Sequence, residues 1–165
     1  MKKLLLLGAF ALFGSMNAQS GFKLGAHVGL PVGDAGDVYS FTLGADASYM
    51  WPVADSFSAG ITSGYSAWLG KTVNYGPVSV KYDTMSMVPI AATGQYKIAE
   101  NFSLAADLGY GFVFGSGGSS DGGFYYQPKA AYHIGNGEVS LGYQGLSKNG
   151  STISAINLGY SYYIK

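Results

Sequence analysis

Residues Thr152–Lys165 read TISAINLGYSYYIK, and the fold is predicted from their pattern. From Ser154 onward, every second side chain is mostly apolar or aromatic, and the intervening ones are mostly small or polar. This alternation is typical of a β-strand whose two faces meet different surroundings. An uncovered strand edge of this length would invite aggregation. We therefore expect this strand to pair with the first strand of the chain and close a barrel.

Seven earlier segments show the same alternation, which gives eight predicted strands in all. The earlier segments are Gly21–Leu30, Tyr39–Trp51, Phe57–Leu69, Met85–Ile98, Phe102–Phe114, Phe124–Ile134 and Glu138–Leu146. Long or flexible connections follow the first, third and fifth strands, short turns follow the second, fourth and sixth, and a polar loop of moderate length, Ser147–Ser151, follows the seventh. This layout predicts an all-β fold, an eight-stranded antiparallel transmembrane up-and-down β-barrel with both termini on the periplasmic side.

The composition indicates which face meets lipid. Charged residues make up 11% of the chain, against about 25% in typical soluble domains. The apolar rows carry Phe, Tyr and Trp near both strand ends and aliphatic side chains between them. Two aromatic girdles around an aliphatic band are typical of the lipid-facing surface of a membrane barrel. In water, the same surface would be an unusually large apolar patch.

The other row is predicted to point into the barrel. It holds Lys23, His27, Asp46, Gln95, Lys97, Asp107, Lys129, His133, Glu138, Asn157 and Lys165. The mixed signs predict internal ion pairs, and His133 and Glu138 face each other across a tight turn. A barrel of eight strands has room for little beyond its own side chains, so no solute channel is expected. Pro89 and Pro128 fall inside strands, where we expect a bulge or a shift of register.

The N-terminal segment has the pattern of a secretory signal peptide. Met1–Lys3 is basic, and Leu4–Phe13 is apolar but too short to span a bilayer as a helix. We expect residues 1–18 to be the signal peptide, with cleavage after Ala18 or after Ser20. Residues 19–165 are then the exported barrel.

Three segments resemble a known family. Val88-Pro89-Ile90 leads into Gln95-Tyr96-Lys97, and Leu104–Phe114 precedes a glycine-rich loop. The last strand is similar to a barrel-assembly signal, with a polar residue, a glycine and spaced hydrophobic residues: Asn157, Gly159, Tyr162, Ile164. The chain thus resembles the small outer-membrane β-barrels of the porin family, OmpA-like or OmpX-like. The resemblance implies a location in the outer membrane, contact with its lipid, and insertion by the barrel-assembly machinery, but it does not imply pore activity.

Several function classes find no support in the residues. The chain has no Cys, which excludes disulfides, thiolate metal sites and Cys nucleophiles, and its zero net charge gives no basis for nucleic-acid binding. The two histidines, His27 and His133, form no recognisable Ser-His-acid spacing. Asp34 and Asp37 lie in a glycine-containing loop without the pattern of an EF-hand. We therefore assign no catalytic, cofactor-binding or metal-ligating residue and expect no enzyme.

The expected role is structural or one of interaction, performed by a monomer. A narrow pore for small solutes is the first alternative, and a lipid-modifying enzyme is the second. The connection Gly70–Thr84 carries Tyr75, Val78, Val80 and Tyr82. It is interpreted either as a solvated loop that extends the barrel strands or as a hairpin that pairs with an extracellular partner.

Overall fold

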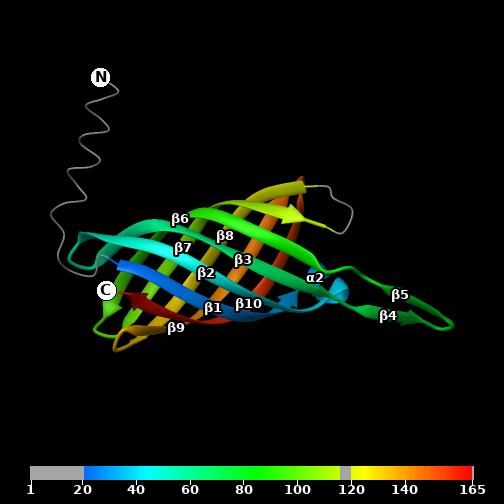
Figure 1. Ribbon diagram of the computed structural model, residues 1–165, viewed down its shortest axis with the longest axis horizontal. Helices are drawn as coiled ribbons and strands as arrows, with labels where there is room; N and C mark the ends of the chain where they lie inside the picture. Colours follow the sequence, from blue (N-terminus) through cyan, green and yellow to red (C-terminus); the bar gives the residue numbers. More distant parts are fainter. Residues whose placement is uncertain (1–20, 116–119, 165) are drawn as a thin grey trace, which may run out of the picture.

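The computed structural model describes residues 21–115 and 120–164, and these form a closed antiparallel barrel (Figure 1). Eight strands close in the order β1-β10-β9-β8-β7-β6-β3-β2. Their bounds are β1 Gly21–Val32, β2 Tyr39–Ala54, β3 Phe57–Gly70, β6 Met85–Ala99, β7 Phe102–Phe114, β8 Ser120–Ile134, β9 Gly137–Lys148 and β10 Ser151–Ile164. The predicted fold class is confirmed. The predicted signal peptide lies outside the described residues.

The closing pair is the one that the sequence predicts. β1 and β10 are antiparallel from Phe22 opposite Ile164 to Val32 opposite Ser154. The strand edge that prompted the barrel prediction is therefore covered along its length. Closure leaves every barrel strand with two hydrogen-bonded neighbours, which a membrane interior requires because it offers no water to unpaired backbone groups.

The two ends of the barrel differ. The turn end holds Gly21, Ile164 and three two-residue turns, which are Asp55–Ser56, Glu100–Asn101 and Gly135–Asn136. The loop end, opposite, holds the short helix α2 (Asp34–Val38) and a hairpin of β4 (Thr72–Tyr75) and β5 (Val78–Lys81). Figure 1 shows this hairpin projecting beyond the barrel wall.

Two connections differ from the sequence-based expectation. The connection that holds Asp34 and Asp37 was expected to be a loop, but it contains α2, whose Ala35 is buried over the barrel. The loop expected at Ser147–Ser151 is a two-residue turn, because Lys148 pairs with Ser151. Its central residues, Asn149 and Gly150, both have positive φ. An Asn-Gly pair accepts that conformation readily, and the resulting turn matches the twist of the flanking strands.

Each proline interrupts the pairing of its strand with one neighbour but does not shift the register. The β3–β6 pairs skip Pro89, and the β8–β9 pairs skip Pro128. Pro89 pairs with Gly111 and Pro128 with Ala106, and the register continues unchanged through both positions. The expectation of a bulge or slip at these residues is wrong. The shifts that do occur lie near strand ends, such as the one between Lys97 and Ala99. Pro89 keeps a hydrogen bond in which its carbonyl oxygen accepts from Ser63 Oγ at 2.9 Å.

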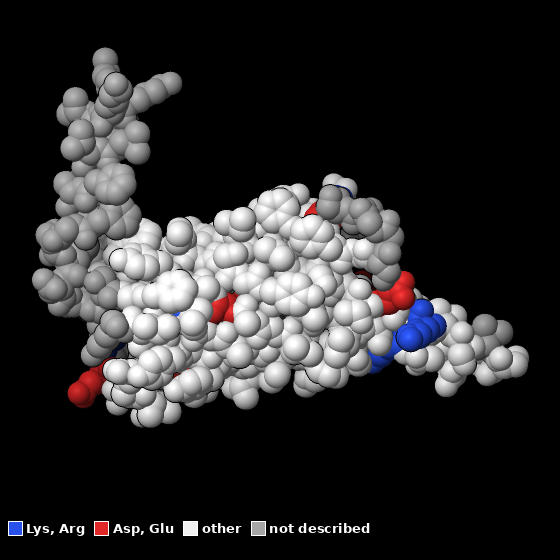
Figure 2. All heavy atoms as spheres, viewed as in Figure 1, with Lys and Arg blue, Asp and Glu red and all other residues white. Residues whose placement is uncertain are grey.

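The outer wall is apolar, as predicted. Large hydrophobic side chains from all eight barrel strands are exposed on it, among them Leu24, Ile61, Leu104 and Leu158. On the face in view, Figure 2 shows few charged side chains on the wall of the barrel and more of them toward its ends. Aromatic neighbours such as Tyr49 and Trp51 near the turn end pack with ring centroids 5.6 Å apart. Within the described residues, no helix is long and apolar enough to cross a membrane.

The lumen at the loop end is filled by an apolar plug. Its buried side chains come from five barrel strands and α2, and they are Ala35, Trp68, Met87, Ala91, Tyr125, Leu146 and Ala155. Trp68 is 0% exposed and meets Tyr39 edge to face, with ring centroids 5.7 Å apart. Lys71 Nζ donates a hydrogen bond to the Gly36 carbonyl oxygen at 2.5 Å, which fastens α2 over the plug.

Candidate functional site

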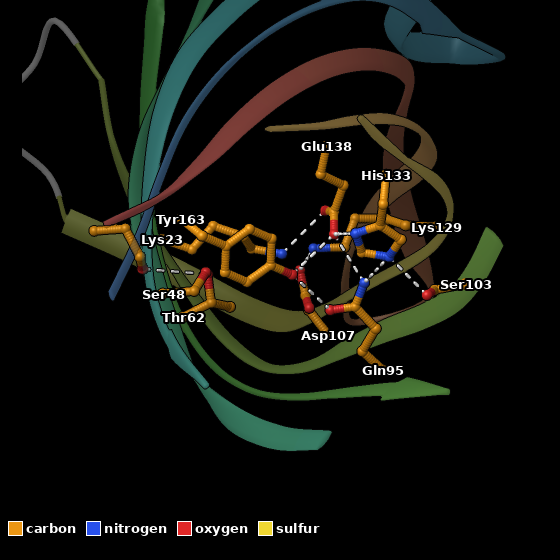
Figure 3. Close-up of polar contacts among 11 residues, drawn as sticks. Lys23, Ser48, Thr62, Gln95, Ser103, Asp107, Lys129, His133, Glu138 and Tyr163 are labelled. Atoms are coloured by element: carbon orange, nitrogen blue, oxygen red, sulfur yellow. Dashed lines mark hydrogen bonds and ion pairs between the residues drawn. The ribbon is translucent and has the colours of Figure 1, made fainter. Parts of the chain in front are cut away.

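The lumen near the turn end is polar, and Glu138 lies at its centre (Figure 3). Lys23 Nζ donates to Glu138 Oε1 at 3.0 Å, and Gln95 Nε2 donates to Oε2 at 2.8 Å. The Tyr163 hydroxyl lies 3.1 Å from the same Oε2. Glu138 is only 3% exposed. These contacts compensate for the hydration that the carboxylate loses when it is buried.

His133 joins this cluster through the register of the sheet. It lies directly opposite Glu138 in the β8–β9 ladder, and its Nδ1 is 3.6 Å from Glu138 Oε2. The predicted proximity of these two residues is confirmed. The His133 Nε2 atom lies 2.8 Å from Ser103 Oγ. Ser103, His133 and Glu138 thus form a chain of hydroxyl, imidazole and carboxylate.

Sequence reasoning missed Ser103 as a partner of His133. Ser103 lies on β7 and His133 on β8, and they meet because Ser103 pairs with Ala131, two residues from His133. The sequence contains the alternation that points both side chains inward. It does not contain the register between the two strands, so this serine was indistinguishable from the other inward serines.

A second chain of the same kind lies in the middle of the barrel. His27 Nδ1 is 2.6 Å from Asp46 Oδ2, and its Nε2 is 3.0 Å from Ser66 Oγ. Beside it, Lys129 Nζ donates to Asp107 Oδ2 at 2.6 Å. Among the described residues, the other oxygen of Asp107 is buried without a hydrogen-bond partner.

The predicted inward row is largely confirmed by these contacts. Its members that take part in hydrogen bonds or ion pairs inside the barrel are Lys23, His27, Asp46, Gln95, Asp107, Lys129, His133, Glu138 and Asn157. Lys97 lines the cavity described next, and Lys165 lies outside the described residues. Asp34 and Asp37 both lie on α2. In the described part of the chain, no three His, Cys, Asp or Glu side chains gather as metal ligands would.

A cavity of about 730 Å³ opens at the turn end. Its lining includes Gln95, Lys97, Ser103, His133 and Tyr163. Further along the lumen is a void of about 30 Å³, bordered by charged side chains that include Lys23, Asp46 and Lys129. Such a void holds about one water molecule. Beyond it, the apolar plug occupies the lumen, so the polar chamber is reached from the turn end.

Comparisons with known proteins bear on the fold. No family model and no curated protein matches the sequence. Among solved structures, the attachment invasion locus protein Ail of Yersinia pestis is 15% identical and has a TM-score of 0.56, with 90% of this chain and 100% of Ail covered. The outer-membrane enzyme PagL is 17% identical at a TM-score of 0.57, with 86% of this chain and 99% of PagL covered.

A third similar structure is a de novo designed transmembrane β-barrel. It is 12% identical at a TM-score of 0.53, with 90% of this chain and 99% of the design covered. An attachment protein, an enzyme and a design share one architecture here, so the likeness identifies the fold and leaves the activity to the side chains. Together with the closed sheet and the apolar wall, these matches show that the chain has the fold of the small eight-stranded outer-membrane β-barrels.

Proposed function

We propose that this chain is an integral outer-membrane protein that uses the β4–β5 hairpin to bind a protein partner outside the cell. The observation that carries the proposal is the position of this hairpin beyond the barrel wall at the loop end (Figure 1). The barrel is then a rigid, monomeric base for the hairpin. This role requires no catalytic residue and no solute flow.

The backbone of the hairpin supports pairing with a partner. β4 and β5 pair with each other from Thr72 opposite Lys81 to Tyr75 opposite Val78, and neither pairs with a third strand among the described residues. A two-stranded hairpin alone is marginally stable in water, and its free edges offer hydrogen bonds to an extended peptide. Val80 is 38% exposed and gives a partner side chain an apolar contact. The proposed occupant is an extended segment of another protein.

The comparison with Ail is consistent with a surface role. Ail is named as an attachment invasion locus protein, and one of its structures holds the heparin analogue sucrose octasulfate. Its 15% identity to this chain carries no residue across. The support for a partner of the hairpin is therefore its free strand edges.

The test uses the refolded protein in detergent micelles and an array of immobilised ten-residue peptides with alternating apolar and polar side chains. The variant replaces Thr72–Lys81 by Asn-Gly. We expect the wild-type chain to bind a subset of peptides and the variant to lose that binding while it keeps heat-modifiable migration on gels. Equal binding by the two proteins, or no binding by either, would contradict the role of the hairpin.

The location in the outer membrane and the signal peptide are tested separately. We propose that residues 1–18 direct export and that the barrel-assembly machinery recognises the last strand through Asn157, Gly159, Tyr162 and Ile164. Fractionation is expected to place the protein in the outer membrane, with a mature N-terminus at Gln19 or Gly21. Recovery in the periplasm, with identical migration of boiled and unboiled samples, would refute the location.

The two alternatives have weaker support. A solute pore conflicts with the plug of Trp68, Met87 and Tyr125 across the lumen. A lipid-modifying enzyme would draw on the likeness to PagL, which extends to the fold alone at 17% identity. The Ser-His-acid chains of this protein face the lumen, where membrane lipid does not reach.

A further inference from the structure

We propose that Ser103, His133 and Glu138 form a hydrolytic site for small carboxylic esters that enter the cavity at the turn end. This activity goes beyond the binding role of the hairpin and uses the opposite end of the barrel. The two proposals share no residue, so either can fail without the other.

The three groups have the order that nucleophilic catalysis needs. Ser103 Oγ is 2.8 Å from His133 Nε2, within hydrogen-bond reach of a general base. When Nδ1 carries the imidazole proton, it lies 3.6 Å from Glu138 Oε2, and Nε2 can accept a proton. The Ser103 hydroxyl is the nearer donor to Nε2, and Gln95 Nε2 lies farther away, at 3.4 Å. The backbone N–H of His133 donates to the Asn101 carbonyl oxygen at 2.8 Å, which fixes the end of the strand that carries the base.

Neighbouring residues hold the charge that such a site requires. Lys23 and Gln95 each donate to Glu138, which favours the carboxylate that orients the imidazole. Lys97 is directly opposite Ser103 in the β6–β7 ladder and also lines the cavity. Residues that are opposite each other on one face have Cβ atoms about 5 Å apart. The Lys97 side chain therefore starts close enough for its ammonium to reach a carbonyl oxygen attacked by Ser103 and to stabilise negative charge there.

Access distinguishes this chain from the similar one in the middle of the barrel. Ser103 and His133 line the cavity of about 730 Å³, whereas Ser66 lines neither that cavity nor the small void. Both serines are almost fully buried, Ser66 at 1% and Ser103 at 2% exposure, so only the cavity lining separates them. The small exposed area of Ser103 favours a substrate with a small acyl group, such as acetyl. The Ser66–His27–Asp46 chain is therefore a matched internal control, with the same order of groups and none of its residues on the cavity lining.

The reaction balances without a cofactor. Ser103 Oγ attacks the ester carbonyl carbon, and its proton moves to His133 Nε2. The carbon–oxygen bond to the alcohol breaks, and the alcohol leaves with that proton. Water then attacks the acyl-serine and gives a proton to His133 Nε2. The proton returns to Ser103 Oγ as the carboxylic acid departs.

The experiment measures p-nitrophenyl acetate hydrolysis and labelling by a fluorophosphonate probe, with the full barrel in detergent micelles. We expect the label on Ser103 by peptide mass spectrometry, no label in Ser103→Ala, and unchanged labelling in the matched control Ser66→Ala. His133→Gln should lower the hydrolysis rate by at least about 100-fold, the usual contribution of a general base. Hydrolysis that is equal in wild type and Ser103→Ala, or an unlabelled wild type, would overturn the proposal.

A cysteine variant tests the same site if Ser103→Ala does not fold. The chain has no Cys, so Ser103→Cys carries a single thiol. We expect methanethiosulfonate to modify this thiol faster than the one in Ser66→Cys. The His133→Gln change should move the pH profile of its modification upward, because the base that forms the thiolate is lost. Equal modification rates for the two thiols, or a pH profile that the His133→Gln change does not alter, would show that the cluster is purely structural.

Discussion

At the level of single residues, the buried carboxylate of Glu138 is the point where several inward side chains meet. Its carboxylate contacts Lys23, Gln95 and Tyr163, and it is nearly inaccessible to solvent. Removing one partner of a buried ion pair is more harmful than replacing both, because the remaining charge stays buried and unpaired. The stability of the polar cluster around Glu138 therefore depends on the pairing of its buried charges.

Glu138→Gln should lower the free energy of unfolding by about 3–5 kcal/mol, because Lys23 loses its counter-charge inside the barrel. Urea titration of the barrel in lipid vesicles, read by heat-modifiable migration, measures this change. The double variant Lys23→Met, Glu138→Leu should recover most of the loss.

The control for this prediction is the exposed pair of Lys148 and Asp121 at the loop end. Asp121→Asn should leave stability unchanged within error, since water screens this pair. A Glu138→Gln variant as stable as wild type would show that water reaches Lys23 in the lumen.

At the scale of elements, the turn between β9 and β10 sets the register of the closing strand. Gly150 has a φ of 84° and Asn149 a φ of 49°. A β-branched residue is strained at positive φ, so Gly150→Val should cost about 1–3 kcal/mol of stability. The same urea titration measures the loss, and slower refolding into vesicles should accompany it.

Gly94→Ala is the matched control for the turn. A Cβ built on Gly94 meets only the Phe57 ring, at 3.4 Å, and this glycine is not among those with positive φ. Its stability should equal or slightly exceed that of wild type, since alanine restricts the unfolded chain. If Gly150→Val is tolerated as well as Gly94→Ala, the turn does not determine the register.

At the scale of the whole molecule, the barrel is a chamber open at the turn end and plugged at the loop end. The wild-type protein in planar bilayers should therefore show no discrete conductance steps. Truncation of Trp68, Met87 and Tyr125 to Ala together should introduce small steps, because these side chains are fully or almost fully buried in the lumen. Leu104→Ala, on the lipid face, is the control and should stay silent. Discrete conductance steps from the wild-type protein would favour the alternative role as a solute pore.

Local sequence patterns were enough to predict the fold and the two faces of its wall. Alternation in Thr152–Lys165 and seven other segments is local information, because the side of a strand that a residue faces depends on its position parity. The same parity placed Lys23, His133 and Glu138 in the lumen, and the His133–Glu138 pair followed from a short turn. The positions of the strand ends were predicted to within a few residues.

The contacts between inward groups could not be predicted from the sequence. Ser103 reaches His133, and Lys23 reaches Glu138, because of the stagger between strands and the curvature of the closed sheet. Neither property can be deduced from a single segment of the sequence. The sequence also did not reveal that the inward apolar residues Trp68, Met87 and Tyr125 gather into one plug, since they come from separate strands. Parity is a local property, whereas register and closure depend on the whole chain at once.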